Sequence, residues 1–261
     1  MIGFIGCGNM ASAIIKGLSA CAIDNIGVYD IDQAKVCEIC ESFKLKAFTS
    51  IKELIKECDK VVLAVKPNVI PDILTKNGDE FQNSNPLIIS IAAGKSLEEI
   101  SSYLPYSPRL VRIMPNINAM VQSAVSAFCL NENASDQDES FAESFCNSFG
   151  KGIKLRENLF SIYSAIGGCS PAFVYMFIDA MARAAVKIGM TKAQALEVSA
   201  QAVLGSAKMV LSSDEHPWQL VDRVCSPGGT TIEGVAALQD NGFDAAIIKA
   251  IEASYNKDKR M

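Results

Sequence analysis

A chain of 261 residues is long enough for two domains, each with its own hydrophobic core. Hydrophobic residues make up 49% of it and charged residues 20%, which excludes an intrinsically disordered polar chain. The formal net charge of -5 offers no basic surface for a nucleic acid, so we predict that none is bound.

The chain start, the apolar runs and the cysteines predict the compartment. The sequence opens on an apolar stretch without the positively charged region of a secretory leader. Asp179 and Arg183 interrupt the most apolar long run, residues 170–186, so we expect no membrane span. Nine cysteines are typical of free thiols in a reducing compartment, and the pair Cys37 and Cys40 has no second pair to complete a metal site. We predict a cytoplasmic protein without a disulfide framework or a metal.

Residues 1–156 alternate short apolar runs with helical patterns, which is typical of a doubly wound parallel β-sheet with helices on both faces. An acidic helix over residues 135–149 and a short last strand close this first domain. The expected strands cover residues 2–6, 26–30, 46–48, 61–65, 87–93, 110–114, 123–130 and 152–155.

The first strand runs into a glycine turn and then into a helical pattern. Gly6 permits a tight turn, Gly8 lets the backbone approach a pyrophosphate, and Ala11 permits close packing of the helix on the strand. The N-terminus of that helix presents unpaired N–H groups and the positive end of its dipole to phosphates. The pattern therefore predicts a dinucleotide-binding site.

Asp30 ends the second strand at the distance where a carboxylate binds the ribose 2′-hydroxyl of NAD. Asp32 adds a second negative charge, unless it serves only as the N-cap of the following helix. Lys35, one turn further on, could accommodate the 2′-phosphate of NADP. The sequence leaves the choice of cofactor open.

Two further sequence segments lie at the carboxyl ends of expected strands, where open α/β sheets bind ligands. One is AVKP, residues 64–67, and the other is SIAAG, residues 90–94. Each is also an ordinary strand exit when taken alone. Their position makes them expected neighbours of the nicotinamide half of the cofactor.

Residues 157–261 lose the strand signals and form an all-helical second domain. Helices expected over residues 171–189 and 192–211 carry apolar residues around most of their circumference, which indicates burial on two sides. We expect a homo-oligomer through this domain; a tightly packed monomeric bundle is the alternative.

The last motif, CSPGGTTIEG, begins at Cys225. Gly228 and Gly229 favour a turn, and a helix is expected from about Thr230. One interpretation is that a threonine simply caps the helix. The other is a site for a small carboxylate, because bare N–H groups, a favourable dipole and a free hydroxyl meet at one helix end.

The order of the sequence blocks resembles that of the pyrroline-5-carboxylate reductase family over essentially the whole chain. The blocks are IGFIGCGNMA, AVKP, SIAAG, RIMPN, SPAFVYMFIDAMARAAV, AQAVLGSAKMV and CSPGGTTIEGV. The resemblance implies a Rossmann-type first domain and an all-α C-terminal dimerisation domain, with higher assembly of the dimers in many members. It also implies reduction of the C=N bond of 1-pyrroline-5-carboxylate to L-proline, with NADP(H) as cofactor and NAD(H) as the alternative.

The resemblance also implies site residues. Thr231 is the expected catalytic residue, as a positioning hydrogen-bond donor to the ring nitrogen of the substrate. The substrate carboxylate is expected on Ser226, Gly228, Gly229, Thr230 and Thr231. The cofactor is expected along Gly6, Cys7, Gly8, Asn9, Met10, Ala64, Val65, Lys66, Ala92, Ala93 and Asn116, in addition to Asp30.

The chain departs from the family pattern at two places. Gly167, Cys169 and Phe173 stand where the family usually has two serines and a tyrosine, so any substrate contact by those side chains is in doubt. Asn118 replaces a proline after RIMPN. The single histidine, His216, has no nucleophile or base nearby in the sequence and is interpreted as structural.

Two other functions are weighed against the reductase. A β-hydroxyacid dehydrogenase shares the glycine turn and a helical second domain. Members of that family resemble one another in a catalytic lysine on the first long helix of the second domain. This chain has only Lys187 on that helix, at its far end. A nicotinamide-binding regulator would need no carboxylate site at the last motif. The sequence therefore favours the reductase.

Overall fold

The structure, a computed structural model in which residues 1–260 are described, divides into two compact units. The sheet unit comprises Met1–Gly168 and the chain end from Lys257, and the helical unit comprises Cys169–Asn256. The predicted domain boundary falls between residues 156 and 157. The compact sheet unit continues to Gly168, because Phe160 and Tyr163 are buried in one of its cores.

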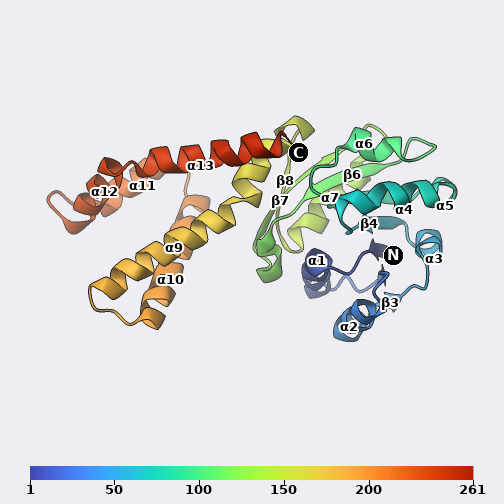
Figure 1. Cartoon of the computed structure of the whole chain (residues 1–261), viewed down its shortest axis with the longest axis horizontal. Helices are drawn as coiled ribbons and strands as arrows, with labels where there is room; N and C mark the ends of the chain where they lie inside the picture. Colours follow the sequence, from blue (N-terminus) through green and yellow to red (C-terminus); the bar gives the residue numbers. More distant parts are fainter. Residues whose placement is uncertain (261) are drawn as a thin grey trace. The chain divides into compact units, whose positions relative to one another are not determined.

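The sheet unit is built on eight strands in the order β3-β2-β1-β4-β5-β6-β7-β8 (Figure 1). The predicted doubly wound sheet is confirmed, with one difference: β7 runs antiparallel to β6. Only residues 115–123 join these two strands, which is too short for a crossover helix, so the chain reverses instead. The strands are β1 Ile2–Ile5, β2 Ile26–Tyr29, β3 Lys46–Ala47, β4 Lys60–Leu63, β5 Leu87–Ser90, β6 Leu110–Met114, β7 Ala124–Leu130 and β8 Gly150–Lys154.

Helices cover both faces of this sheet, and each face has its own hydrophobic core. Side chains alternate along a strand, so neighbouring residues serve different cores. Phe4 and Ile89 belong to the core under α1, α2 and α7, whereas Ile5 and Ile88 belong to the core under α3 to α6 and α8. The helices are α1 Asn9–Ala20, α2 Gln33–Phe43, α3 Ile51–Glu57, α4 Ile70–Lys76, α5 Gly78–Ser84, α6 Leu97–Ser102, α7 Asp136–Asn147 and α8 Phe160–Tyr163, followed by a π-helical turn, Ser164–Gly168.

The helical unit contains no strand among its described residues, as the sequence predicted. Helices α9 and α10 form an antiparallel pair joined by a short turn (Figure 1). The helices are α9 Ser170–Lys187, α10 Lys192–Leu211, α11 Pro217–Val224, α12 Thr230–Asp240 and α13 Phe243–Asp258.

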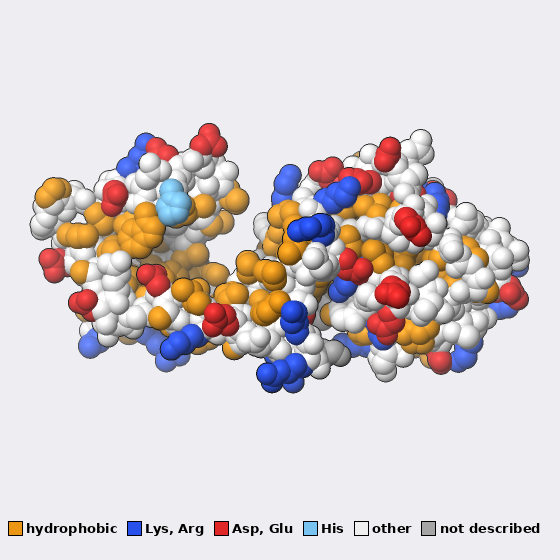
Figure 2. All heavy atoms as spheres, turned by 90° about the horizontal axis from the view of Figure 1, so that it is seen from above, with side chains coloured by type: hydrophobic (Ala, Val, Ile, Leu, Met, Phe, Trp, Pro, Cys, Tyr) orange, Lys and Arg blue, Asp and Glu red, His pale blue; other side chains and the backbone are white. Residues whose placement is uncertain are grey.

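This unit leaves many apolar side chains uncovered. Only Pro171 and Ala182 are buried on α9, and α11 and α12 bury none. Figure 2 shows hydrophobic side chains gathered around the one histidine of the chain. The exposed members on α9 and α10 include Val174, Tyr175, Met176, Phe177, Val186, Leu196, Val198, Leu204, Met209, Val210 and Leu211. A single copy of the unit therefore leaves a large apolar surface exposed to solvent.

The same surface explains a hydropathy signal. One helical stretch, Glu157–Lys187, is long and apolar enough to cross a membrane by length and composition, and 22% of its apolar window is buried. Asp179 and Arg183 lie within it and form an ion pair at 2.6 Å. An apolar helix that packs against another protein surface has the same length and composition.

Candidate functional site

The loop between β1 and α1 exposes its backbone. Gly6 has a φ angle of +107°, and a side chain there would bring its Cβ to 2.5 Å from the carbonyl oxygen of Ala64. Gly8 is the N-cap of α1 and no side chain caps this helix. A Cβ at Gly8 would meet no atom within 4 Å, so the loop is open on this side. The first N–H groups of α1 thus form an accessible helix end suited to an anion.

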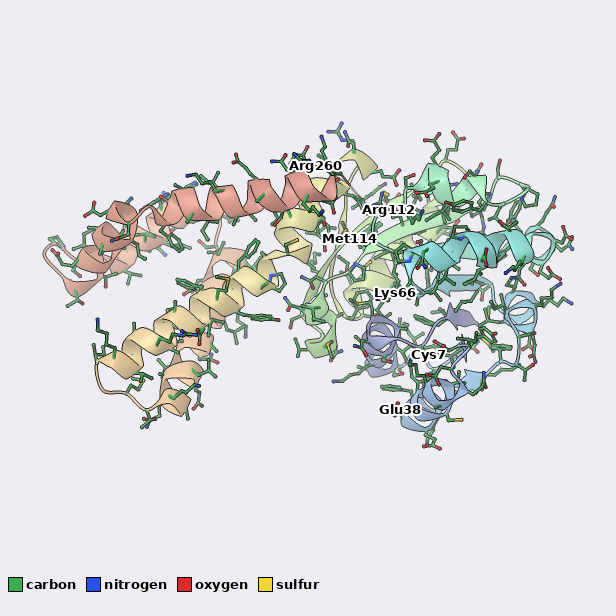
Figure 3. All side chains as sticks on the ribbon, viewed as in Figure 1. Cys7, Glu38, Lys66, Arg112, Met114 and Arg260 are labelled. Atoms are coloured by element: carbon green, nitrogen blue, oxygen red, sulfur yellow. The ribbon has the colours of Figure 1, made fainter. Side chains whose placement is uncertain are left out.

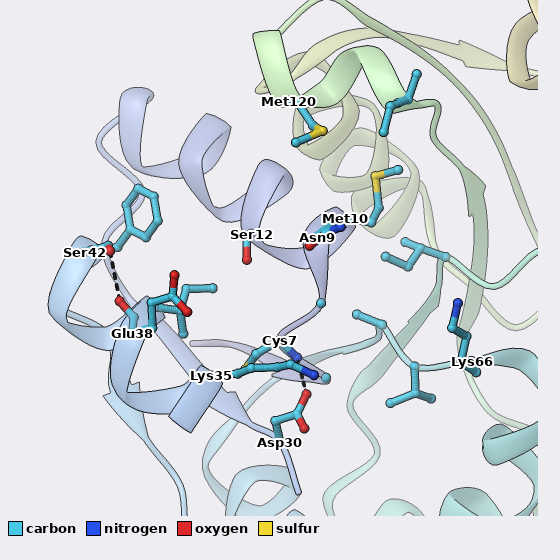
Figure 4. A pocket seen from close by; sticks show the side chains of 18 residues that line it. Cys7, Asn9, Met10, Ser12, Asp30, Lys35, Glu38, Ser42, Lys66 and Met120 are labelled. Atoms are coloured by element: carbon cyan, nitrogen blue, oxygen red, sulfur yellow. Dashed lines mark hydrogen bonds between the residues drawn. The ribbon is translucent and has the colours of Figure 1, made fainter. Parts of the chain in front are cut away.

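This helix end borders a cavity of about 870 Å³ at the carboxyl ends of β1, β2 and β4 (Figure 4). Cys7, Lys66 and Met114 follow one another across that edge of the sheet (Figure 3). Of the residues expected along the cofactor, those lining the cavity are Gly6, Cys7, Gly8, Asn9, Met10, Asp30, Ala64, Val65 and Lys66. Ala92, Ala93 and Asn116 do not line it, although Ile91, next to Ala92, does.

Helix α2 supplies lining residues that the sequence reasoning missed. Lys35 was considered only as a partner for a 2′-phosphate, and Glu38, Ile39, Ser42 and Phe43 were not considered. They recur at helical spacing along one face of α2, and that periodicity was the signal available to find them. The remaining unpredicted lining residues are Ser12, Ile117 and Met120, while Ile91 belongs to the expected phrase SIAAG.

Asp30 is held at the end of β2 by two backbone groups. Its Oδ2 accepts a hydrogen bond from the N–H of Cys7 at 2.7 Å, and its Oδ1 accepts one from the N–H of Asp32 at 2.9 Å. The carboxylate therefore ties the glycine loop to the second strand and fixes a negative charge at the cavity wall. Asp32 is the N-cap of α2 and accepts from Ala34, as the alternative interpretation of that residue expected.

The thiol of Cys7 lies in this loop but is not a nucleophile. Burial, and secondarily the charge of Asp30, raises the pKa of Cys7 to about 12. The thiolate, which is the reactive form of cysteine, is therefore absent at neutral pH. Among residues 1–260, no group of three or more His, Cys, Asp or Glu side chains is arranged to hold a metal ion.

The last strand of the parallel series, β6, is fixed by a half-buried ion pair. Arg112 donates to Oε1 of Glu157 at 2.8 Å, and the same oxygen accepts from the N–H of Leu97 at 2.8 Å. The guanidinium carbon of Arg112 also lies 4.5 Å from the ring centroid of Phe160. One carboxylate thus joins β6, the start of α6 and the segment before α8.

Asn116 lies in the turn after β6 and is buried. Its Nδ2 donates to the carbonyl oxygen of Gly167 at 2.8 Å, while its Oδ1 is buried without a hydrogen-bond partner. Asn116 therefore fixes the π-helical turn to the end of the sheet. A buried amide oxygen without a partner is uncommon in folded proteins.

In the helical unit, the predicted start of a helix at Thr230 is confirmed. The N-cap is Gly229, however, and no side chain caps α12, so the interpretation of a threonine as the cap is wrong. Gly228 has a φ angle of +66°, and Gly229 donates to the carbonyl oxygen of Ser226 at 3.0 Å. This turn leaves the first N–H groups of α12 beside the side chain of Thr231.

His216 has a structural role at α11. It is the N-cap of that helix; its Nδ1 accepts from the N–H of Trp218 at 3.3 Å, and Gln219 closes the capping box by accepting from the N–H of His216 at 2.8 Å. This geometry agrees with the interpretation made from the sequence.

The comparisons with known proteins agree over the whole chain. The family model described as pyrroline-5-carboxylate reductase dimerisation matches residues 157–261, and the model described as NADP oxidoreductase, coenzyme F420-dependent, matches residues 1–94. The chain is 39% identical to the pyrroline-5-carboxylate reductase of Escherichia coli, with 100% of this chain and 97% of that protein aligned.

Solved structures give the same result. The pyrroline-5-carboxylate reductase of Coxiella burnetii superposes with a TM-score of 0.95 at 32% identity, covering 99% of this chain and 97% of that one. The Plasmodium falciparum pyrroline carboxylate reductase, solved with NADP bound, superposes with a TM-score of 0.86 at 30% identity over the same shares.

Proposed function

The chain belongs to the pyrroline-5-carboxylate reductase family, and from this premise we propose how its residues carry out the reduction. It is an NAD(P)H-dependent enzyme that reduces the C=N bond of 1-pyrroline-5-carboxylate to L-proline, the last step of proline biosynthesis. The observation that carries this function is the full-length match at 39% identity to a reductase of that name. Membership in this family sets aside both the β-hydroxyacid dehydrogenase and the regulator.

The glycine loop and its cavity fit the part that NADP(H) and NAD(H) have in common. The bare backbone at Gly8, the uncapped start of α1 and the fixed carboxylate of Asp30 suit a pyrophosphate and its adjoining ribose. Ala64, Val65 and Lys66 extend the lining toward the nicotinamide half. Ala92, Ala93 and Asn116 lie beyond this lining and are proposed as neighbours of the nicotinamide. When bound, the reduced nicotinamide supplies the hydride for the imine carbon.

The start of α12 suits the substrate carboxylate. Its free N–H groups and helix dipole favour an anion, and no side chain competes for them as a cap. We propose that Ser226, Gly228, Gly229, Thr230 and Thr231 hold the carboxylate there, with the Thr231 hydroxyl donating to the ring nitrogen. Orientation of the imine carbon then does most of the catalytic work of the protein.

The absence of a charged acid or base among these substrate residues is compatible with the chemistry. An imine nitrogen is basic enough to bind as an iminium or to accept a proton from a hydroxyl or water. Thr231 is half-buried and is a neutral donor, so its role is to position the nitrogen.

The assembly and the location of the protein are two further proposals. The exposed apolar side chains of α9 and α10 belong to the segment matched by the dimerisation model. We propose that a second copy of the chain covers them in a homodimer, and that the protein is cytoplasmic. Size-exclusion chromatography with light scattering tests the dimer, and a monomeric protein at working concentration would refute it.

The function is tested by oxidation of NADPH or NADH, followed by its absorbance, with 1-pyrroline-5-carboxylate as substrate. Loss of one hydrogen bond to a charged or reacting group costs about 10- to 100-fold in kcat/KM, so we expect that decrease in Thr231→Ala. Thr231→Ser retains the hydroxyl and should recover most of the activity. Cofactor binding without turnover in the unmodified protein would refute the reductase.

A further inference from the structure

A second, smaller cavity adjoins the cofactor cavity at Asp30. Its volume is about 290 Å³, and Gly6, Asp30 and Val65 line both cavities. The remaining wall is mainly apolar and comes from Ile5, Ile31, Ile51, Val69 and Ile73, together with Tyr29 and the charged or polar Asp72, Lys76 and Asn77. Ile31 is 91% exposed, so its apolar side chain is accessible to a planar base in this cavity.

Asp30 lines both cavities, and its position indicates where each part of a dinucleotide would bind. A pyrophosphate at the start of α1 and a planar base in the apolar cavity place the adenosine ribose between them, beside Asp30. Because both carboxylate oxygens of Asp30 accept backbone hydrogen bonds, the side chain cannot swing away without breaking the anchor of the glycine loop. A group attached to the ribose 2′-oxygen must therefore face this carboxylate.

Carboxylates outnumber lysines around this position. Lys35 is paired with Asp32 at 3.4 Å, and Lys76 is paired with Asp72 at 2.9 Å. Glu38 also lines the larger cavity. No arginine is among the residues 1–260 that line either cavity, although arginine is the usual partner of a 2′-phosphate. Lys66, the remaining lysine of the lining, lies in the loop after β4 (Figure 4).

We propose that Asp30 makes this enzyme prefer NADH to NADPH, although the cofactor class of its family includes NADP(H). This inference rests on the proposed function and specifies its cofactor. A 2′-phosphate carries nearly two negative charges at neutral pH and would meet the fixed carboxylate of Asp30, with Asp32 and Glu38 nearby, against the single positive charge of Lys35. A ribose 2′-hydroxyl can instead donate to that carboxylate. Electrostatic discrimination of this kind is expected to reach about tenfold or more in affinity.

The test measures binding and turnover separately. Isothermal titration calorimetry of the full chain with NADH, NADPH, ADP-ribose and 2′-phospho-ADP-ribose gives the affinity ratios without any reaction. Initial rates with 1-pyrroline-5-carboxylate give kcat/KM for the two reduced cofactors. We expect the forms without the 2′-phosphate to bind at least about tenfold more tightly and NADH to have the higher kcat/KM.

Two matched substitutions locate the cause. Asp30→Asn removes the charge but keeps an oxygen for the backbone of Cys7, and should shift the affinity ratio toward NADPH by about tenfold. Asp24→Asn makes the same chemical change at the opposite end of β2, where neither cavity is lined, and should leave the ratio unchanged. A thermal melt shows whether Asp30→Asn remains folded; if it does not, Glu38→Gln should shift the ratio in the same direction by a smaller factor.

The outcomes separate the two claims. Turnover with tighter binding of NADPH, or an unchanged ratio in Asp30→Asn and Glu38→Gln, would overturn the inference and leave the reductase standing. No turnover with either cofactor would overturn the proposed function and this inference with it.

Discussion

The contact between Gly167 and Tyr163 gives a stability prediction whose sign depends on the background. A Cβ at Gly167 would lie 2.6 Å from Cε2 and 2.7 Å from Cζ of the Tyr163 ring. The ring cannot withdraw easily, because it is buried and its hydroxyl donates to the carbonyl oxygen of Val125 at 2.6 Å. Gly167→Ala therefore overpacks this site, which costs about 1–3 kcal/mol.

Two opposing effects set the net value. Alanine is favoured over glycine in a helical segment by about 1 kcal/mol, so we expect Gly167→Ala to lower the free energy of unfolding by up to about 2 kcal/mol. In a Tyr163→Leu background the ring is gone, the overpacking disappears and only the helical preference remains. There, Gly167→Ala should be neutral or should stabilise the protein by up to about 1 kcal/mol.

Urea unfolding of the four proteins, at one protein concentration because assembly affects apparent stability, completes the double-mutant cycle. The expected coupling energy is about 1–3 kcal/mol. An equal loss of stability from Gly167→Ala in both backgrounds would refute the steric argument. A confirmed coupling would explain why this chain has glycine where its family usually has serine: the tyrosine ring occupies the place of that side chain.

Three further predictions follow from the described contacts. Arg112→Met removes the partner of Glu157, whose side chain is 31% exposed, and should destabilise the protein by about 1–3 kcal/mol in urea unfolding; an unchanged midpoint would show that the pair contributes nothing. Burial raises the pKa of Cys7, Cys129 and Cys146 to about 12 and that of Cys58 to about 11, from 9.0, so the unfolded chain releases these protons first. The stabilisation from these buried thiols is therefore complete below pH 9. The free energy of unfolding falls as the pH rises toward the folded pKa values, by up to about 1.4 kcal/mol per thiol and pH unit. A urea midpoint that does not change between pH 8 and 10.5 would contradict this prediction. Met176→Glu places a charge on the exposed apolar face of α9 and should weaken the dimer in light scattering, whereas Ile153→Glu on β8 should not; equal effects would argue against α9 as the interface.

The sequence predicted the parts of this fold that depend on local periodicity. Strands, the glycine turn after β1 and the start of α12 at Thr230 follow from apolar spacing and from glycine placement, which act over a few residues. The antiparallel direction of β7 was not predicted, although the short connection between the expected strands 110–114 and 123–130 was the signal available for it. The identity of the cap at α12 also required coordinates, since Gly229 and Thr230 are both acceptable there.

The candidate site shows the same division. The sequence predicted the carboxylate of Asp30 at the cofactor site, but it could not predict the two backbone hydrogen bonds of that carboxylate. One of these bonds joins residues 23 positions apart and the other joins residues 2 positions apart, so both depend on the folded structure. The lining contributed by Glu38 and Ser42 depends on the rotation of α2 about its axis. The coupling of Gly167 to Tyr163 was read in the sequence only as missing hydroxyls, because a ring filling the position of an absent side chain is a property of packing.

Neighbouring residues of a strand belong to different cores, so substitutions at neighbouring positions affect different faces of the sheet. Ile88 and Ile89 are adjacent in the chain, yet the first contributes to one core and the second to the other. A volume change at Ile88 is therefore compensated among α3 to α6, and one at Ile89 among α1, α2 and α7. The sheet separates the two cores. Residues of one core can therefore be substituted during evolution without a change in the packing of the core on the other face, which supports the cofactor loop.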